Sequence, residues 1–210
     1  MQKNKTLKKL LNSFSMYLSM IAIDVVLLPT DNVIKKAIEL NKGLRKIKLD
    51  KKNCLPHISL MMGCVNEEKI RNFENVLEEI ANGFSKIKIK ANKIRLIKIP
   101  LFEPISVIEI EKTKELQELH EKIVKKLRPY CSYNATKEMI YGADENFSSI
   151  TLSWINNYLK KSSYENFFPH ITLGFGKARK IKPFSFTTSR LALCWLGNYC
   201  TCRKILWEKK

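Results

Sequence analysis

Two short sequence motifs, called the histidine words below, are nearly identical and contain the side chains that are best suited to catalysis. Residues 55–63 read LPHISLMMG and residues 168–176 read FPHITLGFG, and together they hold two of the three histidines in 210 residues. A single histidine on a strand is usually a structural polar residue, and so is a nearby Ser or Thr. Two words of the same pattern, each with one of the few histidines, favour a shared catalytic role for His57 and His170.

The expected geometry of the words suits phosphoester chemistry without a metal. In a strand, side chains two residues apart point to the same face, so His57 projects with Ser59 and His170 with Thr172. A neutral imidazole can take a proton from an attacking oxygen while a protonated one supplies a proton to the leaving oxygen. An ordinary histidine pKa of about 6.5 allows both forms near neutral pH. The two hydroxyls can hold the non-bridging phosphate oxygens, on which charge grows in the transition state.

The third histidine does not share this pattern. His120 lies in an expected helix beside Glu118, Glu121 and Lys122. We expect it on the surface or partly buried, with no catalytic role.

Hydrophobic periodicity places the two words in similar supersecondary units. A strand, a helix and a second strand are expected twice, each time with one histidine word, which is typical of an internal repeat. Expected strands cover 21–29, 57–65, 86–99, 105–111, 170–176 and two segments around 196–198, and expected helices cover 30–46, 67–84, 113–127 and part of 148–161. We predict an α+β fold, a bilobal pseudo-twofold duplication in which two antiparallel-rich sheets face a central cleft with helices packed outside.

Residues 20–210 are predicted to form a single bilobal domain, with residues 1–19 as an N-terminal extension. Residues 129–166 are predicted to be an insertion into this domain. Its aromatic side chains can form a lid or base-stacking wall over the cleft, or a local core of a surface insertion. These aromatic residues are Tyr130, Tyr133, Tyr141, Phe147 and Trp154.

The N-terminal stretch imitates a signal peptide, with a basic start and an apolar middle. Ser and Asn residues dilute the apolar part, Asp24 interrupts it, and no small-x-small cleavage site follows. No apolar run is long enough to span a membrane. We expect a cytoplasmic protein without stable membrane association. Membrane binding through the N-terminal stretch is the alternative, which cell fractionation would test.

The chain is strongly basic, with 38 Lys and Arg against 20 Asp and Glu, or a formal net charge of +18. Such a charge favours attraction to polyanions, nucleic acid above all. A genome that favours Lys codons explains the same excess equally well. The basic residues are scattered along the sequence, so the charge alone does not identify a binding site.

The six cysteines give no pattern typical of a zinc site. There is no Cys-x-x-Cys pair, and no histidine stands at ligand spacing from a cysteine cluster. Cys200 and Cys202 alternate in an expected strand, where we predict buried, reduced thiols.

The paired HIS and HIT words, each after a proline and within a strand, resemble the motifs of the two-histidine (2H) phosphoesterase superfamily. Its members include the RNA 2',3'-cyclic phosphodiesterases, also called RNA 2',5'-ligases, the plant cyclic nucleotide phosphodiesterases and the RNA-trimming Usb family. The likeness extends from about Ile21 to the last hairpin, where RLALCWLGN resembles the closing strands of that fold.

The resemblance implies a metal-independent phosphodiesterase that needs no cofactor. Its substrate would be a 2',3'-cyclic phosphate of an RNA end or small nucleotide, or a 2',5'-phosphodiester bond. His57 and His170 would be the catalytic acid–base pair, and Ser59 and Thr172 would bind the phosphate. The sequence leaves open which histidine is the base, and we favour His170. The expected partner is this RNA end or small cyclic nucleotide, and we expect a monomer.

The chain departs from that family in two ways. Members described as RNA ligases often have Arg two residues before the second histidine and another basic residue soon after the word. Here Phe168 and Phe175 take these places, Lys177 is the nearest cation, and Phe168 becomes our candidate for stacking on a base. The histidines are also 170 − 57 = 113 residues apart, and we assign the surplus to 129–166. A nucleotide- or RNA-binding module of the same fold with little turnover is the alternative function.

Overall fold

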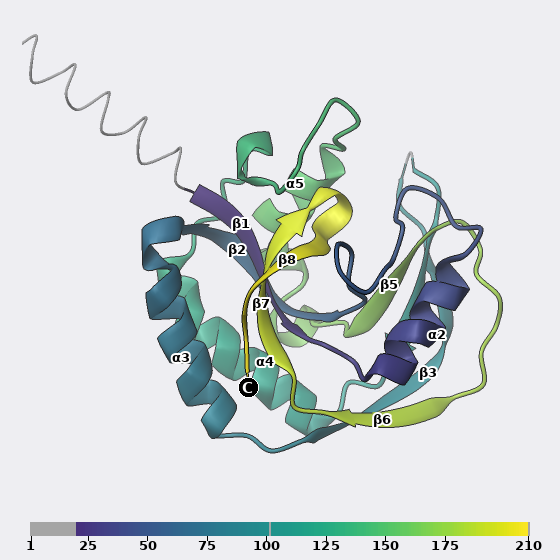
Figure 1. Ribbon diagram of the computed structural model, residues 1–210, viewed down its shortest axis with the longest axis horizontal. Helices are drawn as coiled ribbons and strands as arrows, with labels where there is room; N and C mark the ends of the chain where they lie inside the picture. Colours follow the sequence, from purple (N-terminus) through teal and green to yellow (C-terminus); the bar gives the residue numbers. More distant parts are fainter. Residues whose placement is uncertain (1–19, 101, 210) are drawn as a thin grey trace, which may run out of the picture.

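The computed structural model describes residues 20–100 and 102–209, so the predicted extension 1–19 lies outside the described residues. In chain order the elements are β1 (Met20–Leu27), α2 (Asp31–Asn41), β2 (Ile58–Asn66), α3 (Ile70–Asn82), β3 (Ile87–Ile97), β4 (Ile105–Ile110), α4 (Lys114–Leu127), α5 (Ile150–Asn156), α6 (Tyr158–Lys161), β5 (His170–Phe175), β6 (Phe184–Thr188), β7 (Leu191–Gly197) and β8 (Thr201–Glu208) (Figure 1). Short 3₁₀ turns join several of them.

All eight strands of residues 20–100 and 102–209 form one curled antiparallel sheet, in the order β6-β3-β4-β5-β2-β1-β7-β8 (Figure 1). The predicted α+β class with two related antiparallel halves is confirmed. The halves are joined edge to edge, because β2 pairs with β5 through Ile58 and Ile171. The prediction of two sheets is therefore refined to one sheet whose central strands carry the two histidine words.

The two halves repeat the same unit. β1-α2-β2 and β4-α4-β5 are each strand, helix and strand, and α2 lies against β5 while α4 lies against β2. Each unit also has a β-bulge at the corresponding point, where Leu60 or Leu173 is the extra residue directly after Ser59 or Thr172. Because a bulge bends its strand and redirects side chains, the two words enter the centre of the sheet with the same local distortion.

Alternation along β1 separates the two faces of the sheet. Ile21, Ile23 and the alternate residues after them join the main core, which also contains the apolar faces of α2, α3 and α4. Ala22 and Val26 face the other way and join two smaller clusters. The three long helices therefore cover one face of the sheet, and the opposite face is free to form a cleft.

Several local predictions need adjustment. Side-chain caps occur ahead of α3, where Asn66 accepts a hydrogen bond from the Glu68 N–H, and at the start of α4, where Thr113 accepts one from the Leu116 N–H. The helix predicted within 148–161 is broken at Asn157 into α5 and α6. Strand β6 was missed, although its sequence FSFTT alternates in the manner of an edge strand.

The prediction that Cys202 is a reduced thiol is wrong. Cys194 and Cys202 form a disulfide between β7 and β8, with 5.5 Å between their Cα atoms. The strands place these residues close enough to bond, which sequence spacing within a hairpin does not show. Cys200 is free, as predicted, but it is half-buried and lies in the 3₁₀ turn before β8 instead of in a strand, and Cys54 and Cys64 are free and buried.

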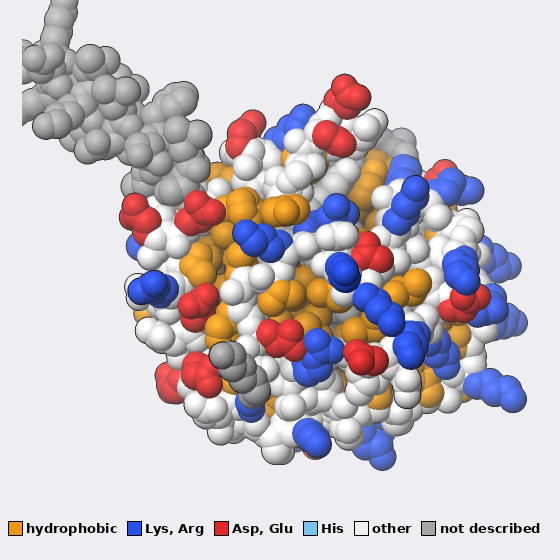
Figure 2. Space-filling view, viewed as in Figure 1, with side chains coloured by type: hydrophobic (Ala, Val, Ile, Leu, Met, Phe, Trp, Pro, Cys, Tyr) orange, Lys and Arg blue, Asp and Glu red, His pale blue; other side chains and the backbone are white. Residues whose placement is uncertain are grey.

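The surface carries its basic charge unevenly. Figure 2 shows Lys and Arg side chains gathered on the side of the molecule where α2 lies, with acidic side chains interspersed over the rest of the viewed face. No helix among residues 20–100 and 102–209 has the length and apolar content needed to cross a bilayer.

Candidate active site

The structure brings the two histidine words together at the centre of the sheet. His57 directly precedes β2 and His170 begins β5, and these neighbouring strands hold the next residue of each word in register. Both histidines, Ser59 and Thr172 line one cavity of about 330 Å³. The isoleucines that follow the histidines point to the other face and are fully buried in the core. Strand alternation thus delivers two imidazoles and two hydroxyls to one hollow.

Both imidazoles are held in the same orientation. Nδ1 of His57 lies 2.8 Å from the carbonyl oxygen of Leu55, and Nδ1 of His170 lies 2.7 Å from that of Phe168. A carbonyl oxygen can only accept, so each Nδ1 carries a proton and donates it. Nε2 is therefore the atom of each ring that is left to exchange a proton with a substrate, which is the arrangement that acid–base catalysis requires.

Burial makes both rings poor at holding a positive charge. It lowers the pKa of His57 to about 4, with the nearby His170 as a smaller cause, and it also lowers the pKa of His170. The side chain of His57 is only 10% exposed. A neutral Nε2 is suited to act as a base, whereas an acid in this cavity needs a neighbour that helps to hold its proton.

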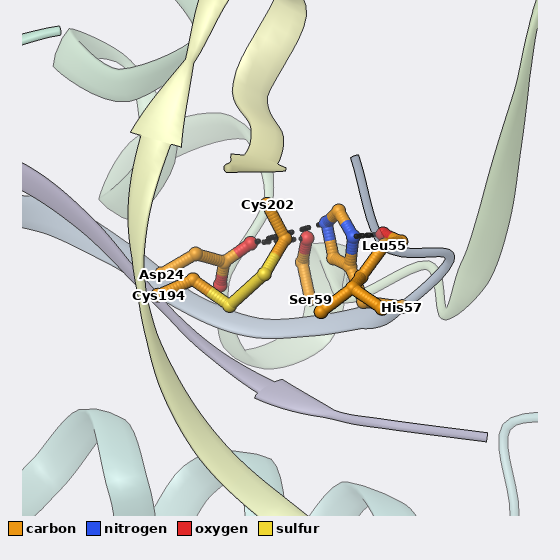
Figure 3. Close-up of a disulfide and its surroundings, with 6 residues drawn as sticks. All are labelled: Asp24, Leu55, His57, Ser59, Cys194 and Cys202. Atoms are coloured by element: carbon orange, nitrogen blue, oxygen red, sulfur yellow. Dashed lines mark hydrogen bonds and ion pairs between the residues drawn. A yellow bond between two sulfur atoms is a disulfide. The ribbon is translucent and has the colours of Figure 1, made fainter. Parts of the chain in front are cut away.

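Asp24 of β1 is such a neighbour, and sequence reasoning missed it. Its carboxyl group is fully buried, Oδ2 accepts a 2.6 Å hydrogen bond from the Ser59 hydroxyl, and Oδ2 lies 3.7 Å from His57 Nε2 (Figure 3). Burial raises the pKa of Asp24 well above its ordinary value. The signal was present in the sequence as a single acidic residue inside an apolar strand, because such a residue is rarely buried without a specific partner.

Phe168 lies against the second histidine. Its ring stacks on that of His170 with 5.2 Å between centroids, and the Arg95 guanidinium lies 4.9 Å from the Phe168 ring centre. Arg95 also pairs with Glu109 at 3.4 Å. Phe168 does line the cavity, but its contacts in the structure orient His170, and a stacking role toward a nucleobase stays a prediction.

The segment 129–166 lines part of the cavity and also packs as a local core, and its stacking on a base stays a prediction. Trp154 lines the cavity, together with Tyr158, which donates a 2.8 Å hydrogen bond to the Leu60 carbonyl. The other aromatic residues named above pack elsewhere. Tyr130 meets Phe73 edge to face, Tyr141 meets Trp195, Tyr133 packs against the main core and Phe147 against a smaller cluster. The segment thus forms one wall of the cavity and a local core behind it.

The glycines that follow the words make room for the chain itself. A Cβ atom on Gly174 would lie 3.1 Å from the Leu44 Cβ and 3.3 Å from the Arg45 carbonyl oxygen, and one on Gly63 would lie 3.0 Å from the Cys131 sulfur. These close approaches bring neighbouring segments against β5 and β2. A glycine at such a position can leave room for a ligand or for another segment of the chain, and the structure shows the second.

The prediction for His120 needs correction, because the residue is fully buried. Its Nδ1 donates to the Leu60 carbonyl at 2.7 Å, its Nε2 accepts from the Tyr164 N–H at 2.8 Å, and its ring stacks on Phe167 at 4.0 Å. Burial lowers its pKa, and a ring that accepts a backbone N–H must be neutral. His120 therefore ties α4 to β2 and to the segment that leads into the second histidine word.

A larger hollow of about 640 Å³ lies between α3, β3 and α4. It is lined by lysines and glutamates, among them Lys86, Lys88 and Glu118, and it contains neither histidine word. We assign the candidate active site to the smaller cavity, because it is lined by both histidines together with the Ser59 and Thr172 hydroxyls.

The sequence matches no protein-family model and no curated protein. Three solved structures nevertheless share the arrangement of the chain. TT0787 of Thermus thermophilus aligns with a TM-score of 0.55 and 13% identity over 90% of this chain and 96% of its own. A phosphoesterase aligns with a TM-score of 0.50 and 14% identity over 90% of this chain and 97% of its own. E. coli LigT in its apo form aligns with a TM-score of 0.50 and 13% identity over 91% of this chain and 97% of its own. The chain therefore has the fold of these phosphoesterase and LigT structures, which is the fold that the resemblance of its two histidine words predicted.

Proposed function

We propose that this protein is a metal-independent phosphodiesterase that opens 2',3'-cyclic phosphates on RNA ends or small nucleotides, or cleaves 2',5'-phosphodiester bonds. The observation that carries the proposal is the shared cavity, in which two imidazoles with free Nε2 atoms and two hydroxyls face one hollow. The fold of structures named phosphoesterase and LigT supports the same reaction class.

The reaction follows from the placement of these groups. His170 Nε2 takes a proton from water as the water oxygen attacks phosphorus. His57 Nε2 gives a proton to the ribose oxygen as its bond to phosphorus breaks. Thr172 donates its hydroxyl proton to a non-bridging oxygen, and Ser59 donates to the other when its hydroxyl turns from Asp24 to the phosphate. The same groups can run the reverse transesterification, in which a 5'-hydroxyl opens the cyclic phosphate and a 2',5' bond forms.

The basic surface and the aromatic cavity wall support a nucleotide substrate. A formal charge of +18 attracts phosphates, and Phe168 and Trp154 offer ring surfaces for a base. A module that binds nucleotides without turnover is the second candidate. Its one supporting observation is the burial of both imidazoles, which makes the protonated form that an acid needs harder to reach.

A panel of substrates tests the proposal directly. We expect the protein to convert 2',3'-cyclic AMP and a cyclic-ended oligonucleotide into phosphomonoesters, identified by mass spectrometry, with the same rate in the presence of EDTA. Binding without product would favour the module, and strong inhibition by EDTA would contradict a metal-independent reaction. A steep fall of affinity with salt would indicate long RNA, because contacts to several phosphates release several counterions.

Thr172 gives a test of phosphate binding. Thr172→Val keeps the shape of the side chain and removes its donor, so we expect kcat/KM to fall roughly a hundredfold, since one lost donor to a developing oxyanion costs about that much. Thr172→Ser keeps the hydroxyl and should retain most of the activity. Equal losses in both variants would show that packing of the methyl group matters, not the hydroxyl. Steady-state kinetics on the cyclic nucleotide would distinguish these outcomes.

A further inference from the structure

The two repeated units of the fold have different residues at one corresponding position near their histidines, Asp24 in β1 and Ile105 in β4. In β1, Asp24 is in register with Met62, and in β4, Ile105 is in register with Phe175, at the same distance along the strand from each histidine. The bulges that precede these pairs also correspond. A carboxyl group therefore accompanies the first histidine word where an apolar side chain accompanies the second.

The surroundings of Asp24 offer its carboxyl group very few partners. Oδ2 binds the Ser59 hydroxyl at 2.6 Å and faces His57 Nε2 at 3.7 Å, and Oδ1 is buried without a hydrogen-bond partner among the described residues. Tyr158 of α6 and Cys200 also face it, and burial raises the pKa of both, so they stay neutral. Cys194, its register partner on β7, is in the disulfide. Within the described part of the chain, His57 is the one ion-pair partner of Asp24.

The second histidine has different neighbours. Glu109 is in register with His170, but its carboxylate pairs with Arg95 at 3.4 Å, and no carboxylate oxygen of residues 20–100 and 102–209 lies within ion-pair distance of the His170 ring. Phe168 stacks on the ring instead. His170 is thus a neutral imidazole without a counter-charge, which suits a base.

We propose that Asp24 and His57 hold one proton between them and that His57 Nε2 delivers this proton to the leaving oxygen, so that the first word is the acid half of the site and the second is the base half. This inference rests on the proposed phosphodiesterase reaction. Asp24 acts through His57 and Ser59 and is a positioning residue. A buried carboxyl and a buried imidazole side by side can share one proton as a unit, because neither bears a lone charge well.

The protons balance over one turnover. Water loses a proton to His170 Nε2 and forms a bond to phosphorus, while the bond from phosphorus to the ribose oxygen breaks and that oxygen takes the proton of the Asp24–His57 pair. The pair is then one proton short and His170 holds one in excess. Exchange with solvent restores both, and the products are one phosphomonoester and one free hydroxyl.

Asp24→Asn tests the pair through the pH profile. Burial raises the pKa of Asp24 well above its ordinary value, so the pair keeps its proton to a higher pH than an ordinary carboxyl group would. Burial lowers the pKa of the His57 ring, so in the variant, where no carboxyl group shares its proton, His57 loses that proton at a lower pH than the native pair does. We therefore expect the alkaline limb of kcat to move to lower pH, with kcat at pH 7 reduced a hundred- to thousandfold. KM should change only a few-fold, because the carboxamide can still bond to Ser59.

Glu111→Gln is the matched control. Glu111 is partly exposed and pairs with Lys90 away from the cavity, so this variant should keep the pH profile of the native protein. A profile of Asp24→Asn that is lowered uniformly but not displaced would overturn the proposal, since a purely structural role predicts that result.

Nuclear magnetic resonance of the unsubstituted protein gives a second test that needs neither substrate nor variant. With ¹³C-labelled Asp and ¹⁵N-labelled His, we expect the Asp24 carboxyl carbon and the His57 ring nitrogens to report one shared deprotonation, at a pH well above the range of an ordinary carboxyl group. An Asp24 that is fully ionised at pH 5 beside a neutral His57 would overturn the inference. A shared deprotonation in a protein that fails to cleave cyclic phosphates would support the pair and reject the proposed reaction, so the two failures are distinguishable.

Discussion

Replacement of His57 or His170 by alanine is expected to reduce kcat on a 2',3'-cyclic phosphate a thousandfold or more, because each histidine makes one of the two proton transfers and such a transfer contributes roughly a hundred- to ten-thousandfold. The double variant His57→Ala/His170→Ala should show no turnover above background. Product affinity, measured by calorimetry, should change only a few-fold, since Ser59 and Thr172 still bind the phosphate.

Asparagine variants distinguish the role of Nδ1 from the role of Nε2 in each histidine ring. In His57→Asn and His170→Asn, the carboxamide N–H can take over the hydrogen bond that Nδ1 donates to the carbonyl of Leu55 or Phe168. Nothing replaces Nε2, so we expect these variants to be as inactive as the alanine variants. Substantial activity in an asparagine variant would show that the ring serves to hold the strand and does not transfer a proton. Turnover in the double alanine variant would reject the assignment of both residues.

Much of the fold could be predicted because its signals are local. Apolar periodicity located α2, α3 and α4, and the repeated strand-helix-strand pattern indicated the duplication. The joining of both halves into one sheet could not be predicted, since it depends on the single pairing of Ile58 with Ile171 between strands far apart in the chain. The Cys194–Cys202 disulfide was missed for a different reason, because its cysteines are 8 residues apart in a predicted hairpin whose register the sequence does not give.

The candidate site also has residues that the sequence could predict and residues that it could not. The hydroxyl and the histidine of each word share a face by strand geometry alone, and the structure places all four of these residues around one cavity. Asp24 comes from a third strand, and its importance depends on the register of β1 against β2, which the sequence does not state. The bulges after Ser59 and Thr172 cannot be read from the sequence either, although the one after Ser59 decides which β1 side chain reaches the first histidine.

Among the single substitutions proposed here, we expect the loss of the His120 side chain to lower the free energy of unfolding most. His120→Ala removes a fully buried ring that stacks on Phe167 and two hydrogen bonds, to Leu60 and Tyr164. The cavity and the unpaired backbone groups together should lower the free energy of unfolding by about 3 to 4 kcal/mol. Glu118→Ala on the exposed side of α4 is the control, and loss of its weak pair with Lys114 should cost below about 0.5 kcal/mol. Urea unfolding of both variants measures the difference.

His120→Phe divides this loss into packing and hydrogen bonding. Phenylalanine keeps the stack on Phe167 but leaves the Tyr164 N–H without its acceptor, so we expect a loss of about 1 to 3 kcal/mol. The pKa of His120 is lowered in the folded state, so its contribution to stability is present above the unfolded pKa of about 6.5 and is lost as the pH falls below it. Below pH 6.5 the unfolding free energy of the phenylalanine variant should therefore decline less steeply than that of the native protein. An identical slope in both proteins would show that His120 is protonated in the folded state, which its two hydrogen bonds forbid.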